Sequence, residues 1–201
     1  MVLLALLCGI DYGSKLAGTT VAAFLWTETG AIQWFYAAKK QDADAMLQVC
    51  LTDLRPELVM LDAPLSLPQV YQNPQTPQPD YFYRAGDKVL RAMSPMFLGG
   101  LTARAMQMAA FCRKLSIPIF ETYPARQADR LSLDRALYKK AQAHIPAIQT
   151  QITTHYTILR QCPPLPSWHA VDALLALVGA LRYAENTHTC YGDPTEGVIY
   201  I

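Results

Sequence analysis

Two uncharged, apolar runs in this chain each end on an aspartate. The first run covers residues 2–10 and ends at Asp11, and the second covers residues 58–61 and ends at Asp62. Continuous apolar runs of this kind, bounded by turn residues, are typical of strands that are buried on both faces. Such strands need helices on both sides of their sheet. The sequence therefore predicts an α/β fold with an acidic side chain at the end of each buried strand.

Length and composition fit a globular protein with a large core. The chain has 201 residues, of which 52% are hydrophobic and 16% charged, so it is not expected to be disordered. A chain of this length buries roughly 70% of the surface that it exposes when unfolded. We expect a single domain over residues 1–201, with an insert at about residues 65–100.

The net charge limits the partners that the chain can bind strongly. It is only +1 at pH 7. Proteins that bind nucleic acid tightly usually carry a clear excess of Lys and Arg. Any contact with nucleic acid is therefore expected to come from a local basic patch.

Cysteine usage and the apolar start of the chain favour a cytoplasmic protein. The five cysteines lie far apart and form no C-x-x-C pair, so neither a disulfide framework nor a zinc ribbon is expected. Residues 1–10 are apolar, but they are too few to cross a bilayer and lack the basic start of a signal peptide. We expect no membrane segment and reduced thiols.

Hydrophobic patterns place strands and helices along the chain. Five strands are expected, at residues 2–10, 19–27, 31–38, 57–61 and 117–120. Helices are expected at residues 42–55, 81–93, 102–115, 124–131, 133–143 and 168–183. Five prolines between positions 64 and 79 predict an irregular loop before the second helix. This order predicts an RNase H-like fold: a mixed five-stranded sheet flanked by helices, with a proline-rich and helical insert.

The expected fold brings four polar side chains toward one place. Asp11 and Asp62 would end adjacent parallel strands, roughly 5 Å apart across the sheet. His169 and Asp172 are three residues apart and share one face of the last helix. Carboxylates this close repel each other unless a cation lies between them, and Mg²⁺ or Mn²⁺ prefers oxygen ligands. We expect Asp11, Asp62 and Asp172 to be the metal ligands.

Such a site suits hydrolysis of phosphodiester bonds in DNA or RNA by a two-metal-ion mechanism. Asp11 would bridge the two ions, with Asp62 and Asp172 flanking it, and His169 would be a ligand or would orient the attacking water. Glu121 also ends a strand. The expected catalytic residues are Asp11, Asp62, Glu121, His169 and Asp172.

Each of these residues also has a structural interpretation. Asp11 could be a turn residue, and Asp62 could begin a loop. His169 could be a residue of the helix start or of the core. Asp172 could be an acid of the first helical turn, favoured by the helix dipole. The joint placement of all four residues favours a site.

A second group of residues could contact the substrate. Aromatic side chains between residues 71 and 83 are interleaved with cations, and such groups stack bases and hold phosphates. The expected substrate-binding residues are Arg84, Lys88, Arg91 and Arg104. A solvated helix face is the open alternative, with Asp87 paired to Arg84 or Arg91.

Several short motifs resemble a widespread family of predicted RNase H-like nucleases. They are Gly9-Ile10-Asp11, Leu61-Asp62-Ala63-Pro64-Leu65, Arg84-x-x-Asp87, Glu121-Thr122-Tyr123-Pro124-Ala125, His169-x-x-Asp172-Ala173-Leu174 and Glu196-Gly197-Val198-Ile199. The resemblance runs from about residue 8 to the end of the chain. It implies the RNase H-like fold and, more weakly, nuclease activity.

The site is also similar to that of RuvC-type Holliday-junction resolvases. Asp11, Asp62, His169 and Asp172 match the acidic pattern of those enzymes in turn. Position 62 is Asp where the resolvases have Glu, which is one methylene longer, and the weak basic charge departs further from a junction binder. Resolvases of this fold work as dimers, whereas the oligomeric state of this chain stays open.

Two other functions fit parts of the sequence. A protein that kept the fold and lost the reaction would be a binding protein. An actin-like ATPase or sugar-kinase-type phosphotransferase also begins with Asp-x-Gly and a small hydroxyl residue, as Asp11-Tyr12-Gly13-Ser14 does. That class needs a second such domain, which this sequence lacks.

Overall fold

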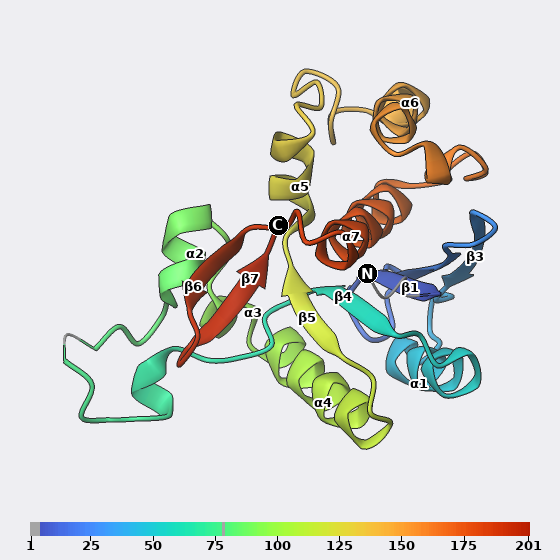
Figure 1. Ribbon diagram of the computed structural model, residues 1–201. Helices are drawn as coiled ribbons and strands as arrows, with labels where there is room; N and C mark the ends of the chain where they lie inside the picture. Colours follow the sequence, from blue (N-terminus) through green and yellow to red (C-terminus); the bar gives the residue numbers. More distant parts are fainter. Residues whose placement is uncertain (1–4, 78) are drawn as a thin grey trace.

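A computed structural model describes residues 5–77 and 79–201 and shows a seven-stranded mixed sheet with helices on both faces (Figure 1). The strand order is β3-β2-β1-β4-β5-β7-β6. The strands are β1 (Leu6–Asp11), β2 (Val21–Trp26), β3 (Ala31–Tyr36), β4 (Leu58–Asp62), β5 (Ile119–Thr122), β6 (Cys190–Asp193) and β7 (Gly197–Tyr200). The α-helices are α1 (Ala43–Leu54), α2 (Ala85–Leu90), α3 (Pro95–Leu98), α4 (Gly100–Lys114), α5 (Pro124–Arg130), α6 (Ile145–His155) and α7 (Trp168–Ala184).

Two apolar layers hold the sheet between the helices. Alternate residues of a strand face opposite sides, so Leu7 of β1 packs with α5, α6 and α7, while Cys8 packs with α1 and α4. Every residue of β1 is buried. Burial on both faces explains why this strand is a continuous apolar run in the sequence.

Helix α7 lies directly against β1. A Cβ atom added at Gly9 would lie only 2.1 Å from the backbone nitrogen of Leu177. Residues 170–181 of α7 are all buried, including Asp172. The missing side chain at position 9 therefore allows the closest approach between the central strand and the helix that carries Asp172.

The predicted fold class is confirmed, but the predicted strand number is too low. β1, β2 and β3 are antiparallel, and β4 and β5 continue the sheet parallel to β1. This is the RNase H-like order expected from the sequence. β7 pairs with β5, and β6 pairs with β7, so the sheet has seven strands instead of five. Both added strands have only four residues, and β6 is mostly exposed while β7 is only partly buried, so neither has the long apolar run that marks β1.

Some element boundaries differ from those predicted. Residues 133–141 form turns and irregular backbone rather than an α-helix, and Lys139 has a positive φ of 58°. Residues 142 and 143 begin a short 3-10 helix, Gln142–His144. Helix α6 was not predicted. The helix expected at residues 81–93 shortens to α2, which ends where Arg91 adopts a left-handed conformation. Residues 2–4 of the predicted first strand and residue 78 of the predicted insert lie outside the described residues.

Two other expectations can be compared with the structure. In the described part of the chain, no helix combines the length and the apolar character needed to cross a bilayer. All five cysteines are free in the structure.

Replacing Gly9 by Ala tests the close approach of β1 and α7. We expect Gly9→Ala to lower the free energy of unfolding by about 1–3 kcal/mol or more, because the new methyl group meets backbone atoms that cannot rotate away. Gly100→Ala is the matched control, since an added Cβ there meets nothing within 4 Å. Urea unfolding measures both variants, and equal stability would contradict the close packing.

Candidate functional site

Three carboxylates meet where β1, β4 and α7 come together. Asp11 and Asp62 are direct partners in the parallel register of β1 and β4. Asp172 reaches them from α7. One carboxylate oxygen from each residue lies within 4.8 Å of the other two. The expected convergence of these three residues is therefore observed, whereas their roles stay predictions.

Local structure explains how Asp172 reaches the strand ends. Ser167 caps α7, with its hydroxyl accepting a hydrogen bond from the backbone nitrogen of Ala170 at 3.2 Å. The helix then crosses β1 with its apolar residues buried. Asp172 is only 4% exposed in this packing. A buried carboxylate needs partners, so its surroundings are informative about function.

His169 contacts the acidic cluster through Asp11. Its Nδ1 atom lies 2.8 Å from Oδ2 of Asp11, and its side chain is 47% exposed. The hydrogen bond to the Asp11 carboxylate raises the pKa of the imidazole above its usual value. His169 is thus held at the rim of the cluster, with one nitrogen committed to Asp11 and an exposed ring.

Two neighbours of Asp172 were missed by the sequence analysis. The Tyr138 hydroxyl donates a hydrogen bond to Oδ1 of Asp172 at 2.7 Å, and Nζ of Lys139 lies 2.5 Å from Oδ2. Both residues belong to the turns at residues 133–141. The sequence contains no local signal for these contacts, because the partners are more than 30 positions apart.

The cluster carries more negative charge than its neighbours balance. No hydrogen bond of the Asp62 side chain is found among the described residues. Burial raises the pKa of Asp62 well above its usual value, and repulsion from Asp11 and Asp172 raises it further. Burial also raises the pKa of Asp172, although Lys139 opposes the effect.

The donor set fits a hard divalent cation. It consists only of carboxylate oxygens, and Asp62 has no cationic partner of its own among the described residues. Mg²⁺ and Mn²⁺ take oxygen ligands, and a bound cation would relieve the repulsion among the three acids. The residues present therefore match the metal that the sequence predicts.

Glu121 does not join these acids but binds Arg84. The Arg84 guanidinium donates two hydrogen bonds to Glu121, at 2.7 and 2.6 Å, and two to Asp87, at 3.0 and 2.6 Å. It donates another to the Ser66 hydroxyl at 2.8 Å. The backbone nitrogen of Leu65 also donates to Glu121. These contacts form a second buried network, the Arg84 network, which joins the insert to β5.

These contacts give Arg84 and Glu121 positions that differ from those expected of a substrate-binding and a catalytic residue. Arg84 is 1% exposed and its guanidinium is fully engaged inside the protein, so it is not a surface residue that a substrate could reach. Both oxygens of Glu121 accept hydrogen bonds from Arg84. Glu121 therefore has a structural partner and is not part of the acidic cluster. Of the two partners left open for Asp87, the structure shows Arg84.

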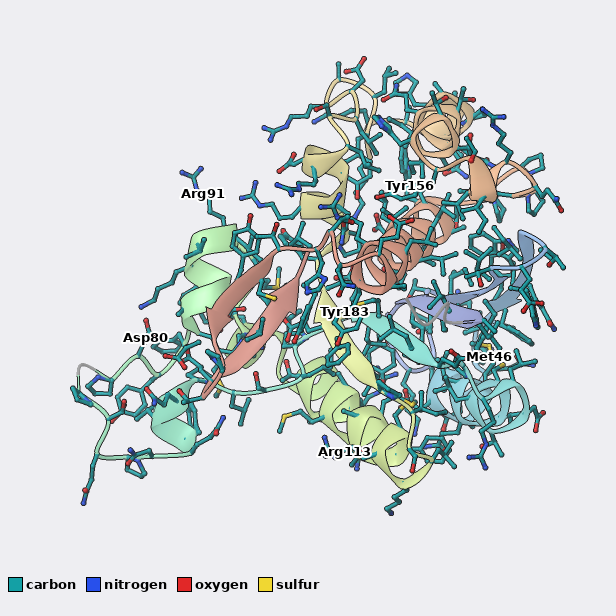
Figure 2. All side chains as sticks on the ribbon, in the orientation of Figure 1. Met46, Asp80, Arg91, Arg113, Tyr156 and Tyr183 are labelled. Atoms are coloured by element: carbon teal, nitrogen blue, oxygen red, sulfur yellow. The ribbon has the colours of Figure 1, made fainter. Side chains whose placement is uncertain are left out.

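The other expected substrate-binding residues differ in their exposure and partners. Arg104 is engaged by Asp44 at 2.8 and 2.6 Å and by the carbonyl of Gly13. Lys88 pairs with Asp80, and its side chain is 56% exposed. Arg91 is exposed and projects from the end of α2 (Figure 2). A role for Lys88 and Arg91 in substrate binding stays a prediction.

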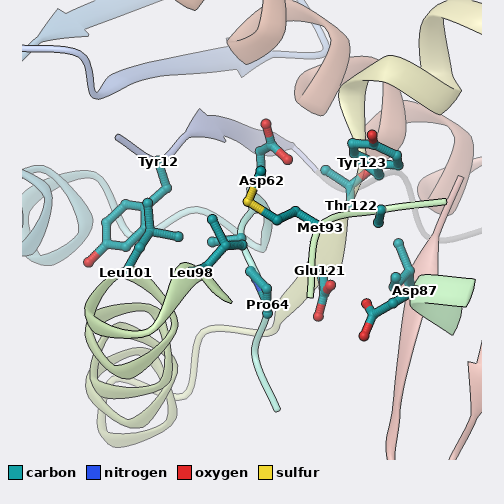
Figure 3. Close-up of a pocket in the computed structure, with 13 residues that line it drawn as sticks. Tyr12, Asp62, Pro64, Asp87, Met93, Leu98, Leu101, Glu121, Thr122 and Tyr123 are labelled. Carbon is teal, nitrogen blue, oxygen red and sulfur yellow. The ribbon is translucent and has the colours of Figure 1, made fainter. Parts of the chain in front are cut away.

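A pocket of about 300 Å³ opens beside the acidic cluster (Figure 3). Asp62 lines it as well as belonging to the cluster. The lining side chains come from the ends of β1, β4 and β5, from β7 and from the insert. They are Tyr12, Asp62, Ala63, Pro64, Asp87, Ala92, Met93, Leu98, Leu101, Glu121, Thr122, Tyr123 and Ile199.

Comparisons with known proteins give no family for the chain. No family model matches the sequence, and no curated protein matches it. RuvC of T. thermophilus in complex with a Holliday junction substrate matches with a TM-score of 0.49 and 16% identity, over 90% of this chain and 96% of that chain. The Thermus thermophilus RuvC structure matches with a TM-score of 0.46 and 14% identity, over 90% and 97% of the two chains. Scores this low do not bear on the chemistry of the site, which rests on its own geometry.

Removing the charge of Asp62 tests the electrostatics of the cluster. A carboxyl group whose pKa is raised by folding opposes folding once it is ionised, so Asp62→Asn should stabilise the metal-free protein at pH 7. We expect a gain of about 1 kcal/mol, the usual size of a single-substitution effect. Mn²⁺ should stabilise the wild type more than the variant, because the variant lacks one ligand.

Thermal unfolding with EDTA and with Mn²⁺ measures both effects. The exposed Asp53→Asn substitution is the control and should change neither stability nor the response to Mn²⁺. A wild type that is indifferent to Mn²⁺ would contradict the metal site.

The buried Arg84 network gives a second prediction on stability. Arg84→Met leaves Asp87 and Glu121 buried without their cation, so we expect a loss of about 3–5 kcal/mol in unfolding free energy. Arg91→Met at the exposed end of the same helix should cost less than about 0.5 kcal/mol. Urea unfolding distinguishes them, and similar small losses would show that the network contributes little.

Proposed function

We propose that this protein is a metal-dependent nuclease that hydrolyses phosphodiester bonds of nucleic acid. The observation that carries the proposal is that one carboxylate oxygen from each of Asp11, Asp62 and Asp172 lies within 4.8 Å of the other two. The proposed metal ligands are these three residues, and the proposed cofactor is Mg²⁺ or Mn²⁺. A bound pair of such cations would supply an activated water and stabilise the leaving oxygen.

The chain's own residues would prepare the site for this chemistry. Asp11 contacts both sides of the cluster, since it is the register partner of Asp62 across the sheet and its carboxylate accepts a hydrogen bond from Nδ1 of His169. We assign Asp11 the central ligand position. His169, oriented by Asp11 at Nδ1, would place its exposed nitrogen toward a water or a substrate oxygen and move a proton there.

Lys139 and Tyr138 would orient Asp172. Their contacts occupy both oxygens of this carboxylate, so its side chain is held toward the cluster. Lys139 also adds a positive charge near Asp62 and Asp11. We propose that it lowers the repulsion in the site and helps to attract an anionic phosphodiester.

Nucleic acid is the proposed substrate, because the ligand set suits a phosphodiester and the surface does not exclude one. With a net charge of +1, most of the affinity would come from the metal site and from a few exposed cations such as Lys88 and Arg91. Binding through few phosphate contacts predicts weak dependence on salt.

Hydrolysis assays with Mn²⁺ test this proposal directly. Labelled single-stranded, duplex and branched DNA and RNA form the panel. We expect Asp11→Asn and Asp172→Asn to lower the rate at least about a hundredfold, because stabilisation of the transition state is lost. His169→Ala should lower it by about the same factor if the imidazole moves a proton.

Circular dichroism should show that these variants keep the fold, and Asp53→Asn should keep the wild-type rate. If the wild type binds Mn²⁺ but cleaves none of these substrates, the nuclease proposal is wrong. The inactive binding protein would then be the better interpretation.

A further inference from the structure

The pocket next to the acidic cluster shares one residue with it. Asp62 takes part in both features: it is one of the three clustered acids, and it lines the pocket. A molecule whose phosphate is held at the cluster would therefore have its neighbouring groups at the pocket mouth. The volume of about 300 Å³ is at the lower end of ligand pockets, which span roughly 300–1,000 Å³.

The charge of the pocket indicates what cannot bind inside it. None of its described lining residues is a cation, whereas three are acids. Two of these acids, Asp87 and Glu121, are already paired with Arg84. A phosphate would find no positive partner in this wall, so the pocket suits an uncharged part of the substrate.

The walls suit a flat, largely apolar group. Met93, Leu98 and Leu101 from the insert and the start of α4 face residues at the strand ends (Figure 3). Tyr12 is held in place by its hydrogen bond to Asp44, at 2.5 Å, and by the Arg104 guanidinium, 4.8 Å from its ring centroid. These contacts give the pocket one rigid aromatic wall.

Tyr123 supplies a polar group at the boundary between the pocket and the acids. It is half-buried, and no partner of its hydroxyl is found among the described residues. Burial raises the pKa of Tyr123, and the nearby Asp62 charge raises it further, so the phenol stays protonated. Its hydroxyl can donate a hydrogen bond to a polar edge of the bound group.

We propose that this pocket receives an unpaired nucleobase next to the scissile phosphodiester. The inference rests on the proposed nuclease function and specifies its substrate: a strand that is single or opened at the cleavage site. The phosphate would lie at the acidic cluster, and the adjacent base would leave the stack and enter between Tyr12, Leu98 and Tyr123. A paired base is stacked inside its duplex, so it must first be extruded before it can enter the pocket.

Abasic substitution tests the inference in the cleavage reaction. The substrate is a single-stranded oligonucleotide in which one nucleotide at a time is replaced by a tetrahydrofuran abasic unit. We expect one position beside the cut to lower cleavage about ten- to hundredfold, the value of a lost base stack. Uniform effects at all positions, or none, would overturn the inference.

Filling the pocket provides the matched test in the protein. Leu98→Trp should cleave the intact and the abasic strand at the same low rate, because its indole takes the place of the base. Val89→Trp is the control: Val89 is 63% exposed on α2 and does not line the pocket, so the wild-type preference should persist. Met93→Trp at the rim, where the side chain is 61% exposed, replaces Leu98→Trp if that variant does not fold. If neither filling variant changes the preference, the inference is wrong.

A binding measurement separates this inference from the nuclease proposal. The probe is an oligonucleotide with 2-aminopurine at the sensitive position, or at each position in turn if no cleavage is seen. Protein is titrated into this probe in Ca²⁺ buffer, and a gel checks that the strand stays intact. We expect its fluorescence to change on binding to the wild type and to Val89→Trp, but not to Leu98→Trp. Cleavage without this pattern overturns the pocket inference alone. Metal binding without cleavage overturns the nuclease proposal, and an unchanged fluorescence then overturns the pocket inference as well.

Discussion

The packing of α7 across β1 is the interaction on which the site depends. The backbone of α7 approaches β1 so closely at Gly9 that a side chain there would meet Leu177. This contact sets the position of Asp172 relative to Asp11 and, through the β1–β4 register, to Asp62. A helix held further from the sheet would leave Asp172 as a buried acid with no other acid to meet.

The same packing creates an electrostatic conflict that a cation can resolve. Burial and mutual repulsion raise the pKa of both Asp62 and Asp172, and the nearby Lys139 and His169 balance only part of the charge. Clusters of this kind oppose folding unless a ligand compensates them. The Arg84 network differs, because its cation is bonded to both of its acids. One network thus holds the insert, whereas the other is left open to a metal.

The sequence was most informative where periodicity is strong. The uncharged runs predicted β1 and β4, the helical pattern predicted α7, and the acids at their ends predicted which side chains would converge. It was misleading for Arg84, because an arginine in a polar, proline-rich region has the pattern of a surface residue. Its burial depends on Glu121, 37 positions away, and on the packing of the insert against β5 and β7.

By itself, the sequence determined the order of the central strands and the acids at their ends, because both follow from local hydrophobic patterns. Only the tertiary structure decided that Lys139 and Tyr138 join Asp172, that Glu121 pairs with Arg84, and that two short strands extend the sheet. These features depend on contacts between distant segments, and such contacts leave no periodic signal along the chain. The pocket beside Asp62 has the same origin, since its walls come from strand ends and an insert that meet only in the folded protein.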